Sequence, residues 1–313
     1  MKNILIINHT VQNCGVYQYG KRFAHIAKKS NKINFLYYEL SNYDDLKNVI
    51  KETNPCAIIY NHLRGTMPWV TDIQVKEIRK QNIKQGLIVH NVGYETFFDF
   101  YLHQNPDYKE IENNFSLCRP LFDYKPNKKI VEPDVINIGT FGFGFHTKHF
   151  DAIVGIVNNE FKNEKVNLNF HLTISHFCPN ENIIGNIKNK CLSYITNKNI
   201  KLNMTNNFIT DEELLDRLYN NDLNIFLYEK YTSYNGISSS IDYALSVKKP
   251  IAICKSNMFS HIYNVEPSIC VEDSSLNNII ANGFEPLEKK YNSWTHDNFV
   301  NKLENVMGKI LYV

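Results

Sequence analysis

The chain has 313 residues, a length typical of two domains with separate cores. Its 34 Lys and Arg residues against 32 Asp and Glu residues give a formal net charge of +2, which removes the strongest reason to expect nucleic acid as the main partner. Hydrophobic residues make up 43% and aromatic residues 13% of the chain, which excludes a disordered protein.

The cysteines and the apolar runs indicate the cellular compartment in which we expect the protein. Seven Cys residues form no CxxC pair, and their odd number argues against a disulfide framework and a structural zinc site. We therefore expect reduced thiols and a cytoplasmic protein. The apolar run at residues 4–7 is shorter than the roughly 7–15 residues of a signal peptide, and no run approaches the ~18 apolar residues of a membrane span. Peripheral contact with a membrane through an amphipathic face remains open.

In the first half of the chain, short apolar runs alternate with segments of helical period, which is typical of βαβ units around a parallel sheet. Between the first two predicted strands, apolar residues from Val16 to Ala27 follow helical spacing, and Lys28 and Lys29 suit the end of that helix. The strands are predicted at residues 3–8, 33–39, 56–60 and 86–90.

The pattern begins again after a polar, proline-interrupted segment at residues 124–133, where we place the linker. The predicted domains are residues 1–127 and 128–313, and the last helix, with Phe299 to Ile310 at helical spacing, is open to crossing back to the first. Thr210 and Glu213 have the spacing of a capping box. Strands are predicted at residues 135–141, 168–173, 223–228 and 250–254.

The loop at residues 12–17 joins the first predicted strand to its helix. Gly15 would let the backbone approach a bound group, the helix N-terminus offers free N–H donors, and Tyr17 lies beside it. A plain turn glycine is the alternative.

The segment at residues 139–148 is rich in glycine and leads to a lysine. Thr140, Gly142 and Lys148 are candidates for binding a diphosphate, because backbone N–H groups and a Lys balance its charge. The spacing matches neither GxGxxG nor the P-loop, so a structural turn with an exposed Lys is the alternative. His146 and His149 could face a metal together, but surface histidines fit better because no carboxylate is arranged beside them.

A third segment, residues 234–245, follows another predicted strand. If a helix starts near Ser238, then Ser238 and Asp242 lie one turn apart, and this face, with Gly236 and Ser239, suits phosphate and ribose. The alternative is a serine N-cap with a solvated Asp.

His90 ends a predicted strand, where it could act as a base or donate to a hydroxyl; a buried histidine with satisfied hydrogen bonds is the alternative. His62 is a weaker candidate of the same kind. No two aspartates are separated by one residue, so a D-x-D metal motif is missing, and the G-x-S-x-G nucleophile elbow is also missing.

Together, the N-terminal strand, glycine loop and helix, His90, and the Arg119-Pro120-Leu121 segment resemble the acceptor half of GT-B glycosyltransferases. Residues 138–148, 211–215 and 236–245 are similar to the donor half of retaining, family-four-like bacterial enzymes associated with surface polysaccharides. The resemblance implies two Rossmann-like domains facing across a cleft. It also implies that Lys148, just inside the first helix of the second domain, binds the diphosphate, and that Asp242, shortened from Glu, binds the ribose. Tyr234 stands where those enzymes carry another Glu near the sugar.

The resulting hypothesis is a metal-independent hexosyltransferase of retaining type, without a cofactor, that uses a nucleotide-diphosphate sugar and a glycan or lipid-linked acceptor. The base would lie near Phe208 and Ile209, and closure of the domains would bring Gly15 and His90 to the sugar. Two alternatives are a GT-B epimerase acting on the nucleotide-sugar and a non-catalytic GT-B binding module, which the Tyr234 replacement favours.

Overall fold

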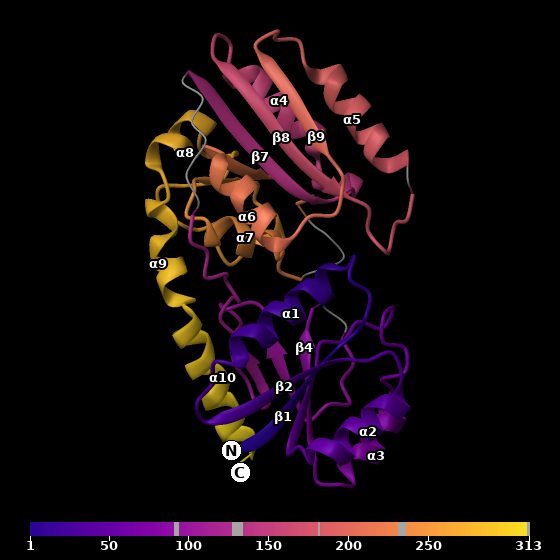
Figure 1. Ribbon diagram of the computed structural model, residues 1–313. Coiled ribbons are helices and arrows are strands. Elements are labelled where there is room, and N and C mark those ends of the chain that lie inside the picture. The colour runs from indigo at the N-terminus through magenta and orange to yellow at the C-terminus, as the bar shows by residue number, and fades with distance from the viewer. Residues whose placement is uncertain (91–93, 127–133, 181, 231–235, 312–313) are drawn as a thin grey trace. The chain divides into compact units, whose positions relative to one another are not determined.

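The computed structural model describes residues 1–90, 94–126, 134–180, 182–230 and 236–311. The chain divides into two compact units (Figure 1). The first comprises residues 1–121, 234–237 and 293–313, and the second comprises residues 122–233 and 238–292. The predicted domain boundary between residues 127 and 128 lies outside the described residues.

The first unit is built on a parallel sheet with the strand order β2-β1-β3-β4-β5-β6. Since parallel strands end at the same edge, the residues after β1, β3, β4 and β5 lie near one another. The strands are β1 (Lys2–Asn8), β2 (Ile33–Glu39), β3 (Ala57–Tyr60), β4 (Lys84–Val89), β5 (Phe100–His103) and β6 (Asn114–Ser116).

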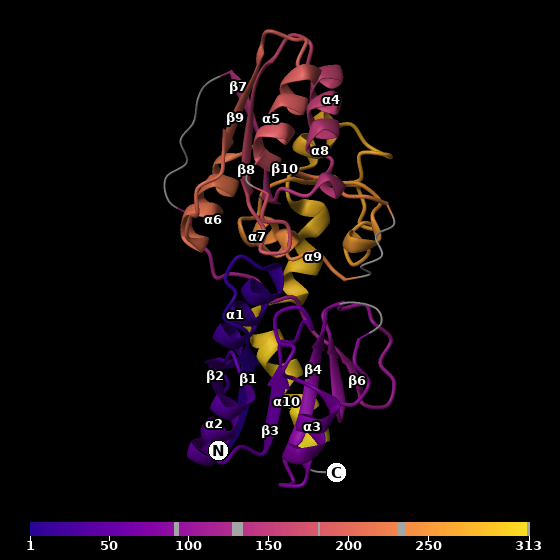
Figure 2. The ribbon, with the colours of Figure 1, turned by 90° about the vertical axis from the view of Figure 1, so that its right-hand side faces the viewer.

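Helices cover both faces of this sheet. Alternate residues of β1 point to opposite faces, so that Ile4 and Ile6 enter one buried cluster and Leu5 and Ile7 enter another. The first cluster includes side chains of α1 (Gly15–Ala27) and α10 (His296–Leu311), which lies along the sheet in Figure 2. The second includes side chains of α2 (Tyr43–Thr53) and α3 (Asp72–Arg79).

Helix α10 is part of the first unit although it comes last in the described chain. Phe299 is 1% exposed and its ring meets that of Phe23 edge-on, with centroids 5.3 Å apart. The buried carboxylate of Glu304 accepts a hydrogen bond from the Ser30 hydroxyl at 2.7 Å and pairs with the Lys32 ammonium at 2.8 Å. Residues far apart in the sequence thus complete one core.

The second unit contains a five-stranded parallel sheet with the order β11-β10-β7-β8-β9. The chain moves outward from β7 to β9 and then crosses back to β10, which places the connecting helices on both faces (Figure 2). The strands are β7 (Val135–Phe143), β8 (Lys165–Thr173), β9 (Ile200–Thr205), β10 (Leu223–Phe226) and β11 (Ile251–Ile253).

The main core of this unit lies on the face covered by α4 (Phe150–Glu160), α5 (Asn182–Tyr194) and α8 (Leu276–Asn282). Helices α6 (Asp211–Asn220) and α7 (Ser240–Ser246) follow β9 and β10 on the opposite face, as Figures 1 and 2 show. The remaining elements are the 3-10 turns η1 (His146–Lys148) and η2 (Asn257–Phe259) and the helix α9 (Glu285–Ser293).

The two α/β domains that the sequence predicts are confirmed, and every predicted strand is present. The capping box at α6 is also confirmed: the Thr210 hydroxyl accepts from the Glu213 N–H at 3.1 Å, and the Glu213 carboxylate accepts from the Thr210 N–H at 2.9 Å. Strands β5, β6 and β9 are additional to the prediction. The cysteines are free thiols. No helix within the described ranges has the length and apolar character needed to cross a bilayer.

Candidate functional site

Lys148 and Gly142 occupy the carboxyl end of β7. Strand β7 runs to Phe143, two residues beyond the predicted end. Gly142 therefore lies in the strand, where it pairs with Leu172, and not in a loop. Its φ of +143° disfavours a side chain, and a Cβ atom at this position would collide with the Lys148 ammonium. Glycine therefore lets the ammonium lie directly against the backbone.

The Lys148 ammonium is surrounded by aromatic rings rather than by acids. Its nitrogen lies 4.9 Å from the centroid of the Tyr228 ring and 6.0 Å from that of the Phe143 ring. Within the described residues it makes no ion pair, and the side chain is half-buried. Aromatic faces attract a cation without neutralising it. This positive charge consequently remains available to an anion.

Tyr228 connects Lys148 to the serines before α7. Its hydroxyl lies 3.0 Å from the Ser240 hydroxyl and accepts a longer hydrogen bond from the Ser238 hydroxyl at 3.4 Å. The backbone N–H of Ser240 in turn donates to the Ser238 hydroxyl at 3.3 Å. The second unit therefore brings together Gly142, Lys148 and the Ser238–Ser240 turn around a tyrosine that the sequence places only at a strand end.

Two details at α7 differ from the prediction. The helix begins at Ser240 rather than near Ser238, and Ser239, its half-buried N-cap, makes no side-chain cap bond because Ser238 meets the Ser240 N–H instead. Asp242 is 0% exposed, so the alternative of a solvated Asp is wrong. The carboxylate is therefore not exposed to a ribose in this structure.

Other predicted residues lie elsewhere than expected. Lys148 ends η1 and is separated from α4 by His149, which has a left-handed φ of 43°, so the lysine precedes the helix instead of lying inside it. Thr140 lies within β7 and is 3% exposed. Gly236 is half-buried and groups with the first unit. Tyr234 lies outside the described residues.

Phe208 and Ile209 lie in the connection between β9 and α6. Phe208 is 68% exposed, which is unusual for a phenylalanine, whereas Ile209 is half-buried. An exposed ring offers a flat apolar surface to a planar group such as a nucleobase.

In the first unit, polar side chains gather where β1, β3, β4 and β5 end. The side-chain amide of Asn61 donates to the side-chain oxygen Oδ1 of Asn8 at 2.7 Å, and its own Oδ1 accepts from Nε2 of His90 at 2.7 Å. The Gln104 amide donates to Nδ1 of His90. His90 is half-buried, and both of its ring nitrogens have protein partners. This arrangement matches the alternative to a catalytic base, which is a histidine with satisfied hydrogen bonds.

Burial and, to a smaller extent, the nearby positive charge of Arg119 together lower the pKa of His90 to about 3. The ring is consequently neutral near pH 7, with its proton on Nε2, where it donates to Asn61. His62 is 7% exposed, and its Nε2 atom has no hydrogen-bond partner. Burial also lowers the pKa of His62. Of the two histidines, His62 is therefore the one with a ring nitrogen that has no hydrogen-bond partner, and that nitrogen is buried.

Gly15 and Tyr17 begin α1. Gly15 is the first residue of the helix and is half-buried, as expected for a site of close backbone approach. Tyr17 is 5% exposed, and its hydroxyl donates to the Glu39 carboxylate at 2.8 Å, so it links α1 to the end of β2. Gly20, one turn later, leaves room for the Asn61 side chain, because a Cβ atom there would collide with that amide.

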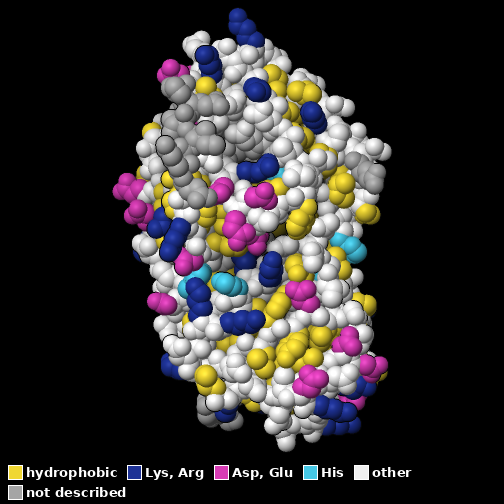
Figure 3. Space-filling view, in the orientation of Figure 1, with side chains coloured by type: hydrophobic (Ala, Val, Ile, Leu, Met, Phe, Trp, Pro, Cys, Tyr) yellow, Lys and Arg dark blue, Asp and Glu magenta, His cyan; other side chains and the backbone are white. Residues whose placement is uncertain are grey.

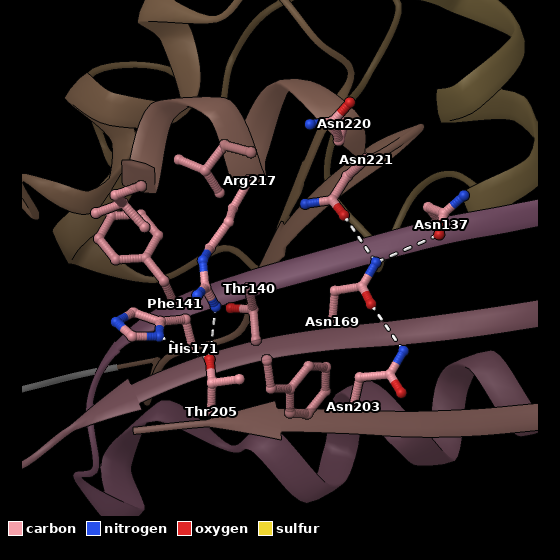
Figure 4. A pocket seen from close by; sticks show the side chains of 13 residues that line it. Asn137, Thr140, Phe141, Asn169, His171, Asn203, Thr205, Arg217, Asn220 and Asn221 are labelled. Atoms are coloured by element: carbon pink, nitrogen blue, oxygen red, sulfur yellow. Dashed lines mark hydrogen bonds between the residues drawn. The ribbon is translucent and has the colours of Figure 1, made fainter. Parts of the chain in front are cut away.

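A polar groove that the sequence did not predict lies in the second unit, between α6 and the sheet (Figure 4). It encloses about 270 Å³ and is lined by residues of β7, β8, β9 and α6, Thr140 among them. His171, Thr205 and Arg217 lie at one end, asparagines lie along the rest, and the apolar part of the lining comes from Phe141, Phe170, Leu214 and Leu218. The alternation of polar and apolar residues along β8 is the signal that could have revealed it.

Charged residues elsewhere are mixed in sign. On the face shown in Figure 3, Lys and Arg side chains are interspersed with Asp and Glu side chains rather than gathered apart. Within the described part of the chain, no three His, Cys, Asp or Glu side chains are arranged to hold a metal ion.

Comparison with known proteins gives a likeness in structure only. No protein-family model matches the sequence. No curated protein matches it either. Among solved structures, HepE from Anabaena in complex with UDP is 10% identical, with a TM-score of 0.66 over 99% of this chain and 100% of that chain.

Two further structures span similar lengths. The lipopolysaccharide outer core galactosyltransferase WaaB is 9% identical, with a TM-score of 0.58 over 99% of this chain and 100% of that chain. An alpha-glucosyltransferase in complex with UDP and a 13-mer DNA is 11% identical, with a TM-score of 0.57 over 97% of this chain and 94% of that chain. At these identities the likeness shows the fold, which is GT-B.

Proposed function

We propose that this protein is a glycosyltransferase that moves a sugar from a nucleotide-diphosphate sugar to a hydroxyl acceptor. The observation that carries the proposal is the Lys148 ammonium, held without an acidic partner among the described residues against Gly142 and the Tyr228 ring. A charge left unneutralised at the end of a parallel strand suits an anionic ligand, and such strand ends are where open α/β sheets bind ligands.

The proposed role of Lys148 is to balance the negative charge that grows on the diphosphate as its bond to the sugar breaks. Groups placed in advance at such a charge are worth more in a site that excludes water. The hydroxyls of Ser238 and Ser240 lie in the same turn, which Tyr228 holds, and would donate to the diphosphate only by exchanging their hydrogen bonds with Tyr228. Phe208, whose ring is exposed, would provide a surface for the base.

On the acceptor side, the first unit offers two histidines with different properties. His90 is neutral and engaged on both nitrogens, so its proposed role is to position neighbouring groups, and it would serve as a base only after Asn61 or Gln104 releases it. Nε2 of His62 has no hydrogen-bond partner but is buried, so its proposed role, to accept a hydrogen bond from an acceptor hydroxyl, requires that the side chains covering it move.

The finer parts of the proposal concern substrates. UDP is present in the HepE and alpha-glucosyltransferase structures, which makes it the first nucleotide to test here. The name of WaaB refers to lipopolysaccharide, whereas the alpha-glucosyltransferase structure contains DNA, so acceptors differ among proteins of this fold. The net charge of +2 favours a glycan or lipid-linked acceptor over DNA. We further propose hexosyl transfer with retained configuration, in the cytoplasm and without a metal ion.

The direct test is calorimetric titration of the full chain with UDP, and with ADP and GDP for comparison, in the presence of EDTA. We expect a diphosphate nucleotide to bind, and the thermal midpoint to rise with ligand concentration. Absence of binding by all three would contradict the proposal and favour a non-catalytic module.

Incubation of the protein with UDP-glucose or UDP-galactose then separates the two enzyme classes. A transferase releases UDP in an acceptor-dependent manner, whereas an epimerase converts the sugar in the absence of any acceptor. Conversion of the donor sugar without acceptor would contradict transfer.

A further inference from the structure

The asparagine groove of the second unit is a second candidate binding site. It lies between α6 and the face of the sheet formed by β7, β8 and β9 (Figure 4). Of its thirteen lining residues, one is charged, Arg217, and none is Asp or Glu. Five are asparagines, whose amides each offer donors and an acceptor. These are Asn137, Asn169, Asn203, Asn220 and Asn221.

The side-chain amides of four asparagines form a chain of hydrogen bonds in which each amide donates to the next. Asn203 donates to Asn169 at 3.0 Å, Asn169 donates to Asn221 at 3.1 Å, and Asn221 donates to Asn224 at 2.9 Å. Asn224, which is fully buried, donates to the Leu218 carbonyl oxygen at 3.1 Å. Because each side-chain amide donates toward the buried end of the chain, the side-chain oxygen Oδ1 of Asn203 is left at the outer end as an acceptor with no partner in the described structure.

The other end of the groove presents donors. Nη1 of Arg217 donates to the Thr205 hydroxyl at 2.7 Å, and that hydroxyl lies 2.8 Å from Nδ1 of His171. Burial, assisted by the charge of Arg217, lowers the pKa of His171 to about 4, so the ring is neutral near pH 7. A neutral ring engaged at Nδ1 presents Nε2 as either a donor or an acceptor, according to its tautomer.

A simpler explanation is a sheet face that faces water, since β8 turns Asn167, Asn169 and His171 to the face opposite the core. The burial of the inner asparagines weighs against it. Asn221 and Asn224 are 3% and 0% exposed, so water does not solvate the inner part of the amide chain. A chain of buried amides costs desolvation but fixes the direction of each dipole in advance.

We propose that this groove binds a saccharide through its hydroxyl groups. A sugar hydroxyl both donates and accepts, which matches a groove with an acceptor at Asn203, a donor at Arg217 and a ring nitrogen of His171 that can take either role. The proposal does not depend on the proposed transfer reaction, because the groove uses none of Lys148, Tyr228 or Ser238.

The test begins with an array of structurally defined oligosaccharides, neutral and acidic, probed with the labelled full chain in saturating UDP. We expect at least one oligosaccharide to be retained. Calorimetry with that oligosaccharide then compares the wild type with Asn203→Ala and Arg217→Met, each of which removes one polar partner and should weaken binding about tenfold. Asn189→Ala, on the exposed side of α5, is the matched control and should bind as the wild type does.

Each outcome decides the proposal. Retention of no oligosaccharide overturns it, as does wild-type binding by both variants, and displacement of the oligosaccharide by UDP would mean that the groove belongs to the nucleotide site. Thermal unfolding checks that Asn203→Ala is folded; if it is not, Arg217→Met, an exposed change on α6, decides alone. Both variants should still bind UDP, so failure here is distinguishable from failure of the proposed transferase function.

Discussion

The polar centres of the two units differ in how fully their hydrogen bonds and charges are satisfied. In the first unit, His90 has a partner on each ring nitrogen, and burial keeps it neutral. In the second unit, Lys148 carries a full charge whose nearest described partners are aromatic rings. The hydrogen bonds of His90 are complete within the protein, whereas the charge of Lys148 is the one that we propose a ligand completes.

This difference separates stability from binding. A network with every bond made contributes to the folded state, and removal of one member leaves buried groups unpaired. A cation without an acidic partner contributes little to the free energy of unfolding. Its removal should therefore leave stability nearly unchanged but weaken ligand binding. The predictions below test whether the two centres divide in this way.

The largest expected effect is on turnover by Lys148→Ala. Loss of one group that stabilises developing charge typically lowers the rate by about 10²–10³, and the free energy of unfolding should change little because no ion pair is lost. Steady-state kinetics with the active donor and urea unfolding measure the two effects. Lys188→Ala, an exposed lysine of α5, is the control. Wild-type turnover by Lys148→Ala would refute its assignment.

Gly142→Ala comes next. The φ of +143° and the lost space for the ammonium should cost about 1–3 kcal/mol in the free energy of unfolding, and UDP should bind more weakly because Lys148 is displaced. Urea unfolding and calorimetry measure these changes. Gly185→Ala on α5, where no atom lies within 4 Å of an added Cβ, should instead stabilise the helix by about 0.5–1 kcal/mol. Equal stability of the two variants would show that Gly142 is not constrained.

The third prediction concerns pH and His90. Its pKa is about 3 in the folded protein and near 6.5 in an unfolded chain, so the unfolded chain binds a proton that the folded chain does not as the pH falls from 6.5. The stabilising effect of neutral His90 is therefore complete above pH 6.5 and is lost toward pH 3. Urea unfolding between pH 7 and pH 4 should show a shallower decline for His90→Gln, by up to about 3 kcal/mol. Parallel curves would contradict this.

Phe208→Ala should have the smallest effect. Because the ring is 68% exposed, the free energy of unfolding should change by less than about 0.5 kcal/mol. If the base stacks on this ring, UDP affinity should fall by about 1 kcal/mol, or roughly fivefold. Calorimetry with UDP and with ribose 5-phosphate, which lacks the base, locates the effect. An unchanged UDP affinity would place the base elsewhere.

The sequence predicts the strands of the fold well because most are continuous apolar runs, such as Ile4 to Ile7. It misses β5, β6 and β9, whose sequences mix polar with apolar residues instead of forming a continuous apolar run. It also misplaces the start of α7, because Ser238, Ser239 and Ser240 are equally good caps by residue type.

The candidate site is predicted less completely. Lys148 and Gly142 are visible as a glycine-rich segment leading to a lysine, but their contact with Tyr228 joins positions that only the sheet order β10-β7 brings together. Nor does residue type show that Asp242 is fully buried or that His90 has two partners. The asparagine chain is hidden because asparagine usually indicates turns rather than the face of a strand.

The placement of α10 has a consequence for how the chain folds during synthesis. The ribosome makes the sheet of the first unit early, but Phe299 and its neighbours, which cover one face of that sheet, emerge only after residues 238–292. Translation at about 5–20 residues per second leaves this face uncovered for many seconds. The second unit can thus finish its core before the first unit does, although its sheet is made later.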